Sequence, residues 1–215
     1  MSVRLRIPRE PADAWAAAGL AVGAVSFAQT FRGSKERFWQ RMTRTGLLLG
    51  GAALAGDPAL RATRARPRDL AGGAAIAAAL YAVFQVGDRA ARIVMPHGSE
   101  DIGDIYALRH IRPVPEIAAR LALVIGPAEE LFWRGLLQRS LARRYGTVGG
   151  AAAATACYGA VHIASGNPTL TGAATVAGAG WSALAAAGVP MPALVASHII
   201  WDIWIFLVQP TQAVT

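Results

Sequence analysis

Charge is scarce in this sequence of 215 residues. Asp and Glu number 13 against 21 Lys and Arg, and charged residues make up 16% of the chain. A typical soluble domain carries roughly 25% charged residues. Hydrophobic residues reach 54%, which is too much apolar surface for a chain that stays disordered in water. These values exclude a disordered chain and argue against an ordinary soluble globule.

Cysteine is almost absent, because Cys157 is the single one in the sequence. A scaffold of intrachain disulfides is therefore excluded. The net charge of +8 is compatible with nucleic-acid binding, but the sequence contains no motif of the usual nucleic-acid-binding modules. We expect no nucleic-acid partner.

The C-terminal part of the chain lacks charge almost completely. Residues 145–201 contain no Lys, Arg, Asp or Glu. A helix needs about 20 apolar residues to cross the hydrocarbon core, so this stretch has room for two spans and most of a third. All basic residues precede it, and we expect them to lie in interfacial loops against membrane lipid.

Glycine and proline divide this long stretch at two places, 166–168 and 188–190. Such clusters end helices. They predict three helices, over 146–165, 169–188 and 191–209.

The N-terminal half has further uncharged runs. Those over 14–31 and 70–87 predict two membrane helices. The run 45–56 is shorter, so a crossing there would need flanking residues. Basic and aromatic residues fill 31–44, which is typical of a segment lying on the membrane surface. The sequence thus predicts an all-α polytopic membrane helix bundle of about six to eight transmembrane segments.

A small set of ionisable side chains interrupts the apolar C-terminal half. Each needs a reason, because a charge in hydrocarbon costs at least about 2.5 kcal/mol. Residues four apart share a helix face, so Glu130 can pair with Arg134, and His198 lies beside Asp202. Pairing of Glu130 leaves the adjacent Glu129 available. The candidate site residues are Glu129, Glu130, Arg134, His162, His198 and Asp202.

Taken singly, these residues have structural explanations, such as an ion pair at the membrane edge or a hydrogen bond between helices. Three helices that each present such groups favour a shared hydrated pocket instead. A carboxylate and two imidazoles there could activate water and stabilise an oxyanion, which is the chemistry of peptide hydrolysis. Glu129, His162 and His198 could alternatively hold a divalent metal such as zinc, although no His-Glu-x-x-His helix is present.

Three short motifs carry a family resemblance. Residues 129–134 have the sequence Glu-Glu-Leu-Phe-Trp-Arg, residues 158–162 have Tyr-Gly-Ala-Val-His, and residues 198–202 have His-Ile-Ile-Trp-Asp. In order and spacing they resemble the Glu-Glu-x-x-x-Arg, Phe-x-x-x-His and His-x-x-x-Asn motifs of the CAAX protease and bacteriocin-processing (CPBP, or Abi) family of intramembrane endopeptidases. Two positions depart from the pattern, since Tyr158 replaces Phe and Asp202 replaces Asn.

The resemblance implies that Glu129 activates water with help from His162. It also implies that His198 and the residue at 202 stabilise the oxyanion, and that Glu130 and Arg134 brace the site. An ionised Asp cannot donate to an oxyanion, so Asp202 must be protonated, orient His198 or bind a metal. The family has been called both metalloprotease and glutamate-type protease, which leaves the metal open.

We therefore expect a CAAX prenyl protease-like hydrolase in a bacterial-type cytoplasmic membrane, cutting membrane-associated peptide or prenylated-peptide substrates. Two alternatives remain, a proton-coupled transporter that uses the same residues as a relay and a non-catalytic bacteriocin self-immunity or scaffold protein. The expected organisation is N-terminal membrane helices with basic loops over 1–114, a catalytic helical core over 115–209 and a short tail over 210–215.

Overall fold

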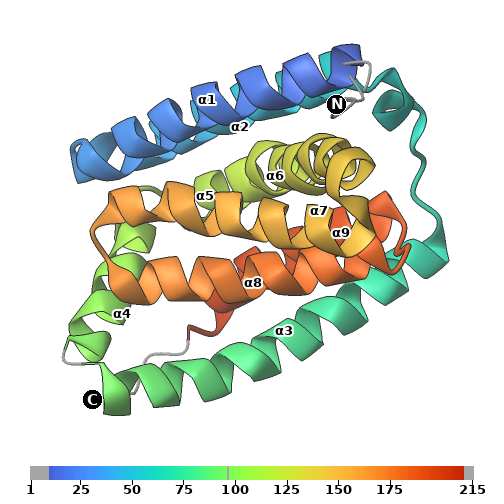
Figure 1. Cartoon of the computed structure of the whole chain (residues 1–215). Coiled ribbons are helices and arrows are strands. Elements are labelled where there is room, and N and C mark those ends of the chain that lie inside the picture. The colour runs from blue at the N-terminus through green and yellow to red at the C-terminus, as the bar shows by residue number, and fades with distance from the viewer. Residues whose placement is uncertain (1–9, 96, 211–215) are drawn as a thin grey trace.

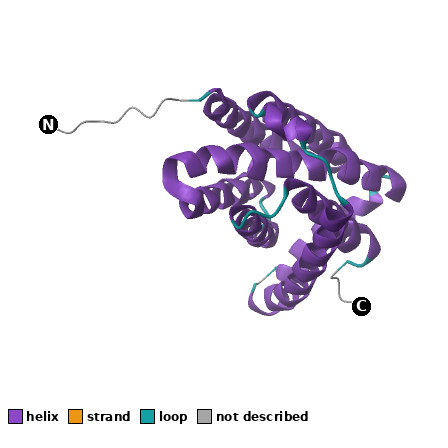
Figure 2. Cartoon of the chain, turned by 90° about the vertical axis from the view of Figure 1, so that its right-hand side faces the viewer, coloured by secondary structure: helices purple, strands orange, loops and turns teal. Residues whose placement is uncertain are grey.

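The computed structural model describes residues 10–95 and 97–210. These residues form helices joined by short loops, with no strand among them (Figure 1; Figure 2). The predicted all-α membrane bundle is confirmed. The predicted tail over 210–215 lies outside the described residues, apart from Pro210.

Helices α1 (Pro11–Arg32) and α2 (Phe38–Gly56) pack side by side along one side of the bundle (Figure 1). Glycine permits the close approach, because a Cβ added at Gly23 would lie 3.0 Å from Leu49 Cδ2. The expected surface segment 31–44 is not a separate element. It divides between the end of α1, a short turn and the start of α2. Its apolar side chains Trp39 and Met42 are buried in the core. The run 45–56 forms the second part of the longer helix α2.

Helix α3 (Pro67–Val94) lies along the opposite side of the bundle and packs against the last helix, α9 (Met191–Ile203) (Figure 1). Within the described part of the chain, three helical segments are long and apolar enough to cross a membrane, by length and composition: Pro11–Arg32, Pro67–Val94 and Met191–Val208. The count of six to eight spans stays a prediction.

A long helical path runs through the centre of the molecule. It consists of α5 (Val114–Arg120), α6 (Gly126–Glu130) and the start of α7 (Gln138–His162), whose backbone breaks at Gly146 with a φ of 74°. Wide π-helical turns, Leu121–Ile125 and Leu131–Leu137, flank α6 on both sides. Pro127 lacks an amide hydrogen and disturbs regular α-helical bonding, and π-helical turns are frequent at functional sites. The path therefore alternates between π-helical and α-helical hydrogen bonding around Glu129 and Glu130.

The ends of the C-terminal helices follow the predicted breaks. Helix α7 ends at His162, α8 spans Pro168–Ala186, and α9 begins at Met191. Gly166 and Gly188 have positive φ angles of 67° and 86°, a conformation that favours glycine and ends helices. Helix α4 (Gly98–Ala107) joins α3 to the central path. Helix α6 packs against both α2 and α9, so its glutamates lie inside the bundle.

Candidate active site

Glu129 lies on α6 and is only 3% exposed. Its Oε2 accepts a hydrogen bond of 2.8 Å from the hydroxyl of Tyr158 on α7. One turn further along α7, His162 Nδ1 lies 2.7 Å from the backbone oxygen of Tyr158. A carbonyl oxygen can only accept, so Nδ1 carries the proton and Nε2 of the neutral ring is free to accept another. A single residue, Tyr158, thus contacts both Glu129 and His162.

Glu130 has a different set of partners. Its Oε1 accepts hydrogen bonds from Arg134 Nη1 at 3.0 Å and from His198 Nδ1 at 2.8 Å. The side chains of Glu130 and Arg134 are fully buried. Arg134 also donates from Nη2 to the backbone oxygen of Gly178 at 3.2 Å. This network joins the central path to α8 and α9.

His198 is held on three sides. Its ring stacks on Trp181, with centroids 4.1 Å apart and planes inclined by 13°. Its Nδ1 is bonded to Glu130, and its Nε2 lies 3.5 Å from Asp202 Oδ2. The imidazole is therefore fixed between two carboxylates and one aromatic face.

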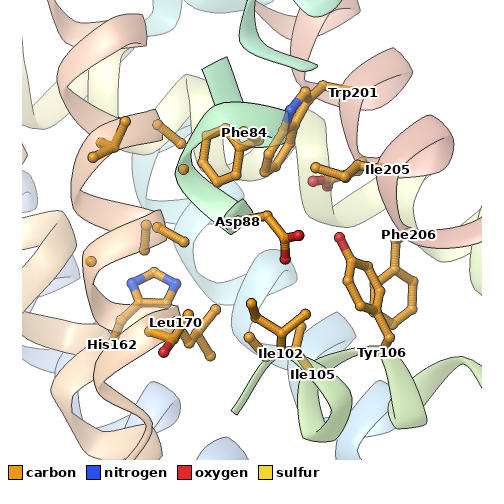
Figure 3. A pocket seen from close by; sticks show the side chains of 18 of the residues that line it. Phe84, Asp88, Ile102, Ile105, Tyr106, His162, Leu170, Trp201, Ile205 and Phe206 are labelled. Carbon is orange, nitrogen blue, oxygen red and sulfur yellow. The ribbon is translucent and has the colours of Figure 1, made fainter. Parts of the chain in front are cut away.

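A cavity of about 560 Å³ opens beside these groups. Glu129, His162, His198 and Asp202 line it, whereas Glu130 and Arg134 do not. Figure 3 shows His162 on one wall, across from Phe206 on another. Most of the lining is apolar and comes from helices on every side, including Phe31, Phe38, Trp39, Met42, Phe84, Ile102, Ile105, Leu121, Ile125, Trp201, Ile205 and Phe206.

The structure brings the six predicted site residues into two connected groups. Four face the cavity, and Glu130 and Arg134 lie behind its wall. Three contacts were not predicted from the sequence: the bond between Tyr158 and Glu129, the bond between His198 and Glu130, and the stacking of Trp181 on His198. The departure of Tyr158 from the family pattern was the only signal for the first of these contacts.

Zinc requires three or four ligands that converge on one point. Among residues 10–95 and 97–210, no group of three or more His, Cys, Asp or Glu side chains is placed to hold a metal ion. His198 directs one ring nitrogen to Glu130 and the other toward Asp202. The candidates Glu129, His162 and His198 therefore do not fit a three-ligand zinc site in this arrangement.

Comparison with known proteins gives one match. No curated protein and no solved structure matches the chain. Residues 113–204 match the family described as type II CAAX prenyl endopeptidase Rce1-like, and this segment contains α5 to α9 and all six predicted site residues. The resemblance indicated by the three motifs is thereby confirmed: residues 113–204, somewhat under half of the chain, are similar to the Rce1-like type II CAAX prenyl endopeptidases.

Proposed function

We propose that this protein is an intramembrane endopeptidase in which Glu129 activates water to hydrolyse a peptide bond. One observation carries the proposal. Glu129, His162 and His198 come from three different helices and line one largely apolar cavity. Carboxylates and imidazoles so placed supply the base and the donors that amide hydrolysis requires.

In the first step, a carboxylate oxygen of Glu129 takes a proton from a water molecule that also contacts His162 Nε2. The water oxygen then bonds to the carbonyl carbon of the substrate, and the carbonyl electron pair moves onto its oxygen. His198 with a proton on both ring nitrogens can donate from Nε2 to this oxyanion. Asp202, 3.5 Å from that nitrogen, orients the ring.

In the second step, the tetrahedral intermediate collapses. The oxyanion electron pair re-forms the carbonyl, the carbon–nitrogen bond breaks, and its electron pair remains on the nitrogen. The proton that Glu129 accepted passes to this nitrogen, directly or through His162, and releases an amine and a carboxylic acid. Glu130 and Arg134 do not touch the substrate in this scheme but hold His198 in place.

The substrate class follows from the cavity walls. Because the lining is mostly aromatic and aliphatic, it suits a membrane-associated peptide with an apolar segment or a prenyl group. The site of action in this proposal is a bacterial-type cytoplasmic membrane crossed several times by the chain, with basic loops in contact with lipid headgroups.

The test uses purified protein reconstituted in liposomes together with membrane-inserted peptides, with and without a farnesylated cysteine. Products are identified by mass spectrometry. The native protein should cleave at least one peptide, and Glu129→Ala or His162→Ala should slow cleavage by about 10²- to 10⁴-fold. Asp104→Asn, which breaks only the exposed ion pair with Lys35, should cleave at the native rate.

Two results would contradict the proposal. One is equal cleavage by the Glu129→Ala variant. The other is proton flux across the liposome membrane by a native protein that cleaves no peptide, which would favour a transporter.

A further inference from the structure

Tyr158 is buried, at 6% exposure, and it lines the cavity together with Glu129 and His162. A buried hydroxyl without a partner is costly. The structure gives this one a partner in Glu129 Oε2, at 2.8 Å. An ionised carboxylate can only accept, so the hydroxyl donates. A phenylalanine would fill the same space and could not make this bond.

The ring of Tyr158 is held in one orientation. Trp133 meets it edge-on, with centroids 5.2 Å apart, and Arg134 Cζ lies 4.9 Å from its centroid on one face. A Cβ added at Gly178 would lie 2.7 Å from Tyr158 Cδ1. Helix α8 therefore packs directly against the ring at Gly178. The ring cannot rotate away from Glu129 unless a neighbouring group moves.

The bond to Tyr158 makes the two oxygens of Glu129 unequal. Oε2 accepts from the hydroxyl, which fixes the side-chain rotamer and leaves Oε1 to accept a proton from water. The backbone oxygen of the same residue fixes the ring of His162 at 2.7 Å. The distance between the two groups that share the water in the proposed mechanism is thus set through one residue.

We infer that Tyr158 is a positioning residue that aims Glu129 at the water molecule, an inference that rests on the proposed peptidase function. It acts through Glu129 and does not itself contact the reacting atoms. Its backbone contact with His162 survives any side-chain change, so the role of the hydroxyl can be tested alone.

The test is Tyr158→Phe, measured as steady-state cleavage in liposomes. We expect kcat to fall about tenfold, which is the effect of one hydrogen bond, with KM within about twofold of native.

Tyr81→Phe is the matched control. Its hydroxyl donates to the backbone oxygen of Gln209, and Tyr81 does not line the cavity. This variant should keep the native kcat and KM. Thermal unfolding of both variants in detergent shows whether each is folded.

A second readout does not depend on activity. The infrared carboxylate band of Glu129 is identified by difference from the Glu129→Gln variant. It should shift in Tyr158→Phe and stay in place in Tyr81→Phe.

An unmoved band, or an unchanged kcat in a Tyr158→Phe variant of a cleaving protein, would overturn the positioning role and leave the peptidase proposal intact. A native protein that cleaves no peptide while the band shifts would overturn the proposed function instead.

Discussion

Glu129 and Glu130 are adjacent, chemically identical and almost equally buried, with exposures of 3% and 0%. Their surroundings nevertheless differ. Glu129 faces the cavity and accepts a hydrogen bond from the neutral hydroxyl of Tyr158. Glu130 lies behind the cavity wall and accepts from a guanidinium and an imidazole.

Successive residues of a helix point about 100° apart, so one turn of α6 sends one carboxylate to the cavity and the next to a helix interface. The partners then separate their roles. A carboxylate balanced by Arg134 is committed to holding helices together. Glu130 Oε2 is buried without a hydrogen-bond partner and away from the cavity, whereas Glu129 faces the cavity, which suits the proton transfer proposed for it. Burial alone would not have distinguished them.

The largest loss of stability should come from breaking the buried ion pair between Glu130 and Arg134. Arg134→Met leaves Glu130 without its buried counter-ion, and breaking a buried pair in this way costs about 3–5 kcal/mol. Thermal unfolding in detergent should show a marked loss of stability. Asp104→Asn, at an exposed ion pair, is the control and should cost at most about 1 kcal/mol. Equal melting of the two variants would show that the Glu130 network does not brace the bundle.

A smaller effect should come from the packing that supports Tyr158. The added methyl group of Gly178→Ala meets the tyrosine ring at 2.7 Å, and such overpacking costs about 1–3 kcal/mol. Unfolding should occur at lower temperature, and cleavage should slow as the ring moves from Glu129. Gly172→Ala on the same helix is the control for stability alone, because its Cβ would meet nothing within 4 Å but would face the cavity. Equal stability of the two alanine variants would count against a tightly held ring.

Much of the C-terminal fold could be predicted because its signals are local. Gly166 and Gly188 adopt positive φ angles, and new helices begin at or just after the prolines that follow them. A few neighbouring residues therefore determine where each helix ends. The pair of Glu130 and Arg134 was predictable for the same reason, since both residues lie on one helical path four residues apart.

The rest depends on contacts between distant parts of the chain. Tyr158 reaches Glu129 and His198 reaches Glu130 only after three helices pack together, and no local pattern encodes which donor faces which carboxylate. The segment 31–44 shows the same dependence on distant contacts. Its basic residues predicted a location on the membrane surface, and the structure adds that Trp39 and Met42 on its apolar side pack into the core.

The most direct test of the proposed role of Glu129 as the base is the cleavage rate of Glu129→Gln in liposomes, compared with that of Glu130→Gln. Glutamine keeps the size of the side chain and removes its capacity to accept a proton at neutral pH. We predict that Glu129→Gln unfolds at the native temperature and cleaves at least about 10²-fold more slowly, whereas Glu130→Gln is measurably less stable. Native-rate cleavage by a folded Glu129→Gln protein would contradict the claim that Glu129 is the base.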